Sequence, residues 1–190
     1  MAFALPLLWL VFHWYQLLNY QSHDLGFNPQ ETTHHTTGEW ALRFLLLTLC
    51  ISPLAKWRPA RKVMIYRRMT GLWCFAYVLM HIISYLWLEK YFDWSEVWAD
   101  IVKRPYITIG VTVFLSLLPL AITSTNGWVK KLGAKRWKAL HRLIYLAALL
   151  APLHFIMMRK GWQIEPRIYA IIALCLIAVR MFSKLKTQPE

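Results

Sequence analysis

The sequence predicts an all-α membrane protein, a six-transmembrane-helix bundle with both termini in the cytoplasm. Of the 190 residues, 58% are hydrophobic and only 16% are charged, whereas a soluble domain is nearer a quarter charged. The apolar residues also lie in runs long enough to cross a bilayer, which takes about 20 helical residues. We therefore expect residues 1–190 to form a single transmembrane domain.

Six spans are expected along the chain, at residues 2–18, 39–55, 70–88, 106–126, 139–158 and 168–182. The first, third and fourth of these contain no Asp, Glu, Lys or Arg. The other three each contain one arginine, namely Arg43, Arg142 and Arg180.

The positions of Lys and Arg predict the orientation. Residues 56–68 contain six basic residues and no acid, and so do residues 127–142. Residues 19–39 contain three acids and no Lys or Arg. Because basic loops stay on the cytoplasmic side, both basic segments are expected there. Beside the spans they would contact anionic membrane lipids, so the net charge of +13 does not indicate a nucleic-acid partner.

Histidine is the polar residue of interest inside the predicted spans, where an ionisable side chain is costly and suggests function. Counted from the cytoplasmic ends, His81 lies about twelve residues into the third span and His154 about sixteen into the fifth. At about 1.5 Å per residue both lie in the outer half, and His141 lies about 20 Å further in. Two imidazoles level on two helices are the arrangement that ligates a haem iron from both sides.

Other roles stay open for these histidines at this point. A single intramembrane histidine more often bonds a neighbouring helix or relays protons. Zinc fits less well, because no third or fourth ligand is expected at the same depth. The three cysteines lie in different spans and form no CxxC pair. A non-redox membrane assembly factor with structural histidines is therefore the alternative class.

Five stretches of the chain resemble one known family. They read HHTTGEWALRFLLLTLCISPLA, RRMTGLWCFAYVLMHIISY, RPYITIGV, LAITSTNGW and KRWKALHRLIYLAALLAPLHF. In this order they are similar to the MsrQ (YedZ) family, the haem-binding membrane subunits of the bacterial periplasmic protein-methionine-sulfoxide reductase system. That family belongs to the ferric-reductase-like transmembrane group, and the resemblance runs from about Leu5 to Arg180.

The resemblance implies a haem b protein of the bacterial inner membrane that passes electrons to a periplasmic molybdopterin enzyme, which reduces methionine sulfoxide. It maps His81, His141 and His154 onto the family's haem-associated histidines, and a flavin, FMN, is also attributed to the family. A cytoplasmic flavin reductase or the quinol pool would donate the electrons, and the sulfoxide chemistry would lie on the partner. A stand-alone transmembrane ferric or quinone reductase is the rival within electron transfer.

The inner histidine lacks an obvious counterpart. The NADPH-oxidase pattern within the wider group has two histidines on each of two helices and holds two stacked haems. Here the positions thirteen and fourteen residues before His81 are Arg68 and Arg67. The inner site is therefore expected to hold either a second haem on His141, with another or no second ligand, or a flavin.

Further residues are candidates for contacts with a cofactor. Basic side chains near the inner end could pair with haem propionates or flavin phosphate: Arg67, Arg68 and Arg142. On the outer side, Arg43 lies a turn inside the second span, with His35 nearby, and could meet an outer propionate. Gly71 would allow close approach of a cofactor or a neighbouring helix. The same arginines also suit surface charge and snorkelling.

Overall fold

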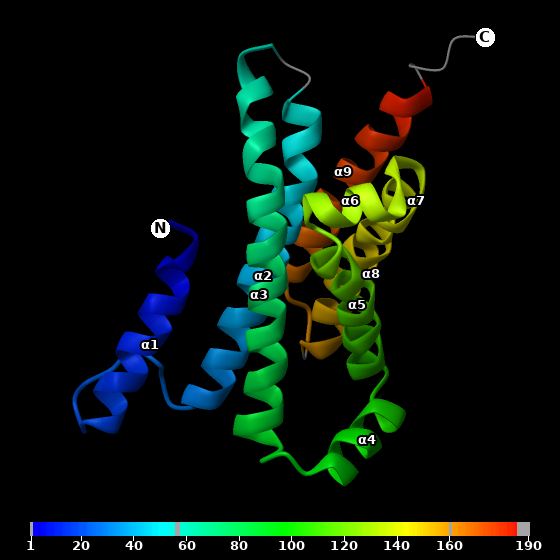
Figure 1. The fold of residues 1–190 in the computed structure, drawn as a ribbon. Helices are drawn as coiled ribbons and strands as arrows, with labels where there is room; N and C mark the ends of the chain where they lie inside the picture. The colour runs from blue at the N-terminus through cyan, green and yellow to red at the C-terminus, as the bar shows by residue number, and fades with distance from the viewer. Residues whose placement is uncertain (1, 56–57, 160, 186–190) are drawn as a thin grey trace.

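The computed structural model describes residues 2–55, 58–159 and 161–185, which form a bundle of helices (Figure 1). Lys56 and Trp57, in the first predicted basic segment, lie outside these ranges. The longer helices are α1 (Leu5–Leu18), α2 (Pro29–Leu54), α3 (Tyr66–Ser84), α5 (Pro105–Ile122), α8 (Leu143–Met158) and α9 (Glu165–Leu185). The shorter ones are η1 (Ala2–Ala4), η2 (Arg58–Ile65), η3 (Tyr85–Glu89), α4 (Trp94–Lys103), α6 (Asn126–Leu132) and α7 (Ala134–Leu140).

Three helical segments among the described residues are long and apolar enough to cross a membrane: Lys62–Glu89, Pro105–Ile122 and Ala134–Met158. They coincide with the third, fourth and fifth predicted spans. α1 is apolar but shorter, and α2 and α9 include charged residues within their apolar stretches. The all-α prediction is thus confirmed for the described residues, while the structure by itself supports three crossings rather than six.

α2 begins much earlier than the predicted second span. Its first residue is Pro29, and the side chain of Asn28 accepts a hydrogen bond from the backbone N–H of Glu31. An Asn cap followed by proline at the first helical position is a strong helix start. The ten residues before the predicted span, eight of them polar, are therefore helical, and His34, His35 and Gly38 lie on the same helix as Arg43.

The predicted fifth span is divided into two helices. α7 ends at Leu140, His141 caps it, and α8 begins at Leu143. The break lies beside His141 and not at Pro152, which lies inside α8. His141 and His154 therefore do not share one continuous helix.

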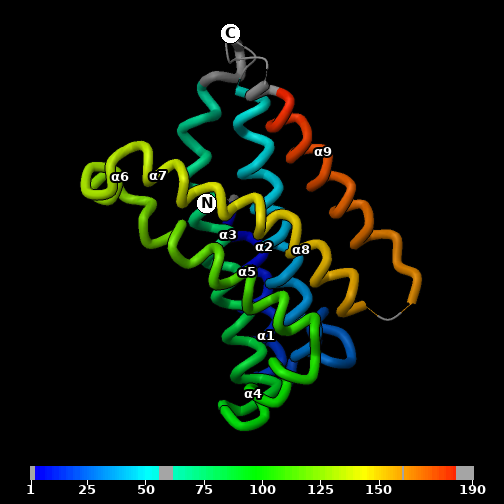
Figure 2. The backbone as a smooth tube through the Cα atoms, turned by 90° about the vertical axis from the view of Figure 1, so that its right-hand side faces the viewer, coloured from blue at the N-terminus to red at the C-terminus, as the bar shows by residue number. Residues whose placement is uncertain are grey.

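The bundle is built from two antiparallel helix pairs, α2 with α3 and α5 with α8 (Figure 1). α9 lies against α8 and α2 (Figure 2), and α1 packs at the edge of the bundle against α2. Leu49, Tyr77 and Ala147 are fully buried in the core between these helices. Each of the two pairs contributes one of the deep histidines.

The described acidic residues are confined to one end of the bundle, where several Lys and Arg residues also lie. We call "the basic end" the one formed by η2, the first turn of α3, α6, α7 and the last turns of α9. The opposite, "acidic end" holds the α1–α2 loop, α4 and the start of α9 (Figure 1). The described Asp and Glu residues lie toward the acidic end: Asp24, Glu31, Glu39, Glu89, Asp93, Glu96, Asp100 and Glu165.

Candidate functional site

His81 on α3 and His154 on α8 face each other inside the bundle. Their ring centroids are 6.2 Å apart and their ring planes are at 88° to each other. Two imidazoles that share one metal have centroids about 6 Å apart, because each metal–nitrogen bond is about 2 Å. The pair therefore has the spacing of two ligands on opposite sides of one metal ion.

A backbone carbonyl orients each of these rings. Nδ1 of His81 lies 3.0 Å from the carbonyl oxygen of His34, and Nδ1 of His154 lies 2.6 Å from that of Tyr106. A carbonyl oxygen only accepts, so Nδ1 holds the proton in both rings. In the neutral ring Nε2 then keeps its lone pair, and metal-ligating histidines show this same outer hydrogen bond. Both rings are thus held in the tautomer that binds a metal.

Each ring also lies against a glycine, four residues after the residue that supplies its carbonyl. A Cβ added at Gly38 on α2 would lie 2.9 Å from Cε1 of His81. A Cβ added at Gly110 on α5 would lie 3.0 Å from Cε1 of His154. Because glycine has no side chain, the ring can approach the helix backbone and reach the carbonyl one turn away. The two helix pairs therefore hold their histidines in the same way.

His34 is a residue of this site that the sequence reasoning missed. Its ring stacks on that of His81, with centroids 3.9 Å apart and planes at 22°. Its Nδ1 lies 3.1 Å from the hydroxyl oxygen of Ser84 on α3. The available signal was the four-residue spacing between His34 and Gly38, but the second span was expected to begin only at Glu39.

Two predicted residues near the outer histidines are instead paired with carboxylates. Nε2 of His35 lies 3.4 Å from Glu31. The guanidinium of Arg43 lies 3.1 Å from Glu39 and 3.7 Å from Glu165. These carboxylates of the chain itself already balance the charge of Arg43.

A cavity of about 300 Å³ lies at the basic end among α2, α3, α5 and α8, with α6 and α7 beside it. Four of the predicted residues line it: Arg67, Arg68, Gly71 and His141. Thr48, Ser124 and Asn126 add polar atoms to its wall. Arg142 is exposed and is not among the lining residues. The volume of this cavity is at the lower end of the range for small-molecule sites.

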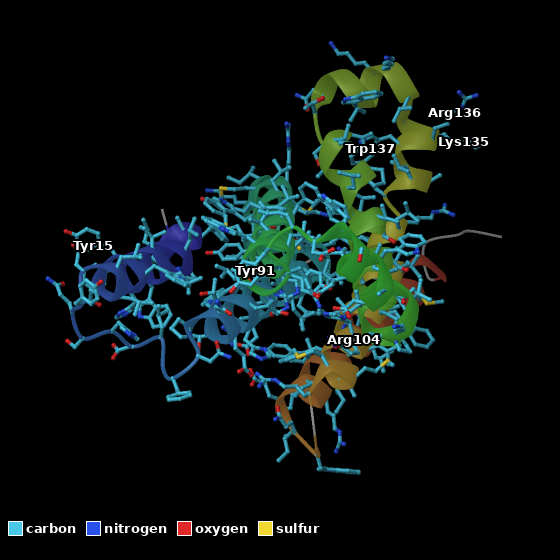
Figure 3. The ribbon with its side chains drawn as sticks, turned by 90° about the horizontal axis from the view of Figure 1, so that it is seen from below. Tyr15, Tyr91, Arg104, Lys135, Arg136 and Trp137 are labelled. Atoms are coloured by element: carbon cyan, nitrogen blue, oxygen red, sulfur yellow. The ribbon has the colours of Figure 1, made fainter. Side chains whose placement is uncertain are left out.

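His141 is held beside this cavity by α7. Its ring stacks on Trp137 with centroids 3.8 Å apart, and its Nδ1 lies 3.1 Å from the Trp137 carbonyl oxygen. The indole of Trp137 donates to the carbonyl of Thr123 at 2.9 Å. Trp137 therefore turns back toward α5, while Lys135 and Arg136 on the same short helix extend away from the bundle (Figure 3).

The His81–His154 pair suits a metal ion whose other ligands come from a cofactor. Within the described ranges, no group of three or more His, Cys, Asp and Glu side chains is arranged to hold a metal ion. The His81–His154 pair offers two nitrogens, and a porphyrin supplies the rest around a haem iron. These two residues therefore fit haem, whereas a protein-only zinc site would need four ligands.

The chain matches a known family over most of its length. The model of the ferric reductase like transmembrane component matches residues 37–152. A protein of Rhodospirillum rubrum, the "Protein-methionine-sulfoxide reductase heme-binding subunit MsrQ", is 47% identical over 184 residues, covering 95% of this chain and 84% of that protein. The chain belongs to the MsrQ family. The resemblance that its sequence motifs indicate is thereby confirmed.

Other members of the MsrQ family are similarly close. The protein of the same name from Caulobacter vibrioides is 39% identical over 182 residues, covering 96% of this chain and 84% of that protein. The one from Herminiimonas arsenicoxydans is 46% identical over 161 residues, covering 84% of this chain and 74% of that protein. The residues matched to the ferric-reductase-like model contain His81 and His141 and stop short of His154.

Proposed function

We propose that this chain is the haem b electron-transfer subunit of a methionine sulfoxide reductase system in the bacterial inner membrane. It would take electrons from a cytoplasmic flavin reductase or from the quinol pool and deliver them to a periplasmic molybdopterin methionine sulfoxide reductase. Its relatives are named as haem-binding subunits of a protein-methionine-sulfoxide reductase. The observation that carries the proposal is the facing pair His81 and His154, with both Nδ1 atoms bonded to carbonyls.

His81 and His154 would hold the haem iron through their Nε2 atoms. The carbonyls of His34 and Tyr106 keep the Nδ1 protons in place, and Gly38 lets one ring lie close to the α2 backbone. A bound haem b would supply a one-electron carrier, and two histidine ligands from the chain would leave no position on its iron for a substrate. This ligand set suits electron transfer and leaves the sulfoxide chemistry to the partner.

His141 and the cavity beside it would form a second, inner cofactor site. Arg67 and Arg68 offer guanidinium groups, which bind propionate or phosphate oxygens well. Gly71 leaves room in the wall, since a Cβ there would meet only Thr48 at 3.7 Å. The occupant would be a second haem with His141 as its one histidine ligand, or FMN.

Six spans with both termini in the cytoplasm would require α1, α2 and α9 to cross the membrane as well. The two basic segments that contain no acid, residues 56–68 and 127–142, support this topology, with the basic end in the cytoplasm. The arginines inside α2 and α9 do not contradict it, because Arg43 is paired with Glu39 and Arg180 is buried in the bundle rather than facing lipid.

Absorption spectra of the purified full-length protein test the haem proposal. The wild type is expected to show a Soret band and the low-spin spectrum of an iron with two imidazole ligands. His81→Ala and His154→Ala should each lose most of the haem, whereas His23→Ala, in the α1–α2 loop, should keep it. A wild type without a Soret band after haem-sufficient expression would contradict the proposal and favour an assembly factor with structural histidines.

A second measurement separates this function from a stand-alone ferric or quinone reductase. The haem is reduced with dithionite, and its reoxidation is followed after adding the oxidised periplasmic methionine sulfoxide reductase. Rapid reoxidation by that protein is expected. Reoxidation by ferric chelates or quinone alone would favour the rival.

A further inference from the structure

An arginine is buried at the basic end without a carboxylate partner. Arg180 on α9 has only 9% of its surface exposed. Its Nε and Nη2 atoms are buried and make no hydrogen bond. Its guanidinium carbon lies 5.8 Å from the ring centroid of Tyr145 on α8. Burying a cation with unused donors is strongly unfavourable unless a counter-charge is present.

Arg67 brings a second positive charge to the same place. This residue on α3 lies close enough to Arg180 for their like charges to interact, and it also interacts with Tyr145. Arg67 lines the cavity beside His141. Each guanidinium group therefore makes an anion between them more favourable.

The described part of the chain offers no carboxylate to meet this need. Its Asp and Glu residues lie toward the acidic end, and no ion pair found there includes Arg67 or Arg180. The arginines near the acidic end behave differently, since Arg43 and Arg159 share Glu39 at 3.1 and 3.3 Å. Snorkelling to water does not explain Arg180 either, because that would leave its guanidinium exposed.

We propose that Arg67 and Arg180 together bind one anionic group, a carboxylate or a phosphate, between α3, α8 and α9 at the basic end. Such a group would accept hydrogen bonds from Nε and Nη2 of Arg180, which form a planar fork matched to two oxygens. Haem propionate, flavin phosphate and the headgroup of an acidic phospholipid all supply this chemistry. The first two sources rest on the proposed function, whereas the phospholipid does not.

The test compares Arg180→Gln with Arg167→Gln in the full-length protein. Arg167 is the matched control on the same helix, near the acidic end, where it stacks over Trp162 at 3.5 Å. Haem and flavin are quantified per chain, and delipidated protein is titrated with mixed micelles containing phosphatidylglycerol or phosphatidylcholine. Loss of a charge-assisted hydrogen bond corresponds to about a tenfold or greater loss of affinity. Arg180→Gln should show that loss for one of haem, flavin or phosphatidylglycerol, which identifies the source.

Two further variants keep the test decisive. Arg180→Lys retains the charge but not the planar fork, so its affinity should fall between those of wild type and Arg180→Gln. If Arg180→Gln does not fold, Arg67→Gln, which removes a partly exposed side chain, takes its place with the same expected loss. If Arg180→Gln binds haem, flavin and phosphatidylglycerol as tightly as Arg167→Gln does, the proposal is overturned.

Failure of the anion-site proposal can be distinguished from failure of the proposed haem function. A wild type that binds no haem, but whose phosphatidylglycerol affinity falls about tenfold in Arg180→Gln, would contradict the haem proposal and support the anion site. Conversely, low-spin haem held by His81 and His154, with no ligand sensitive to Arg180, would support the function and overturn the anion site.

Discussion

Replacing Gly38 with alanine is expected to displace His81 and release haem from a protein that still folds. The added Cβ would lie 2.9 Å from Cε1 and 3.0 Å from Nδ1 of His81. Carbon contacts are most favourable at about 3.5–4.0 Å, so the ring has to move by about 0.6–1 Å. The bond from Nδ1 to the His34 carbonyl, now 3.0 Å, would then exceed the usual limit of about 3.2 Å. A metal site tolerates ligand shifts of only about 0.2 Å.

The same change should leave most of the protein folded. Overpacking a buried site costs about 1–3 kcal/mol. Replacing a helical glycine with alanine returns about 0.5–1 kcal/mol. The net loss of about 0–2.5 kcal/mol is smaller than the 5–15 kcal/mol typical of whole-domain stability at about room temperature. Loss of haem should therefore exceed loss of folded protein.

Haem per chain and the low-spin signal are measured by absorption and electron paramagnetic resonance. Gly38→Ala and Gly110→Ala should each lose about tenfold or more of the low-spin haem, a loss of at least about 1.4 kcal/mol in binding. Gly127→Ala is the control, because its Cβ would meet only Thr125, at an ordinary 3.9 Å. A Gly38→Ala protein with a full low-spin spectrum would refute the reasoning that glycine permits the ring orientation.

Two other predictions concern the inner site and α4. His141→Ala should reduce the inner cofactor but keep the low-spin haem signal, and loss of that signal would contradict two separate sites. Asp100 accepts from Lys90 at 2.8 Å. Although burial raises the pKa of its carboxyl, the hydrogen bonds from Lys90 and Tyr85 outweigh burial and lower that pKa below 3.8. Its stabilisation is therefore present above pH 3.8 and lost as the pH falls through the lower pKa of the folded state. Asp100→Asn should cost about 0.5–1.5 kcal/mol near neutral pH and weaken the acid dependence of thermal unfolding, whereas an unchanged acid dependence would contradict this role.

Much of the candidate site could be predicted from residue type and helical rise alone. An ionisable residue in an apolar run is unusual however the helices pack. This signal alone made His81, His141 and His154 candidates. The rise per residue is nearly constant in any helix, so counting along two spans placed His81 and His154 at one depth. The structure brings their rings to 6.2 Å, and it gathers Arg67, Arg68, Gly71 and His141 around one cavity.

The start of α2 could not be predicted from apolar patterning. Residues 29–38 are polar, so hydropathy marks them as a loop, although Asn28 and Pro29 form a capping signal. Setting the helix start at Glu39 hid the one-turn relation between His34 and Gly38. That relation orients His81, and it depends on a helix being continuous across a change from polar to apolar sequence.

The sequence by itself determined the membrane class, the all-α fold and the choice of His81 and His154 as candidate ligands, because these depend on composition and on the fixed geometry of the helix backbone. Only the tertiary structure decided how each side chain is paired. Arg43 and Arg180 are each a lone arginine in an apolar run, and the sequence already offers Arg43 a partner in Glu39, one helical turn before it. Packing of α9 against α2 adds Glu165 beside Arg43, whereas it leaves Arg180 without a carboxylate among the described residues. The reason is physical: the rotation of a helix about its axis, and the neighbours it meets, are set by contacts between distant parts of the chain.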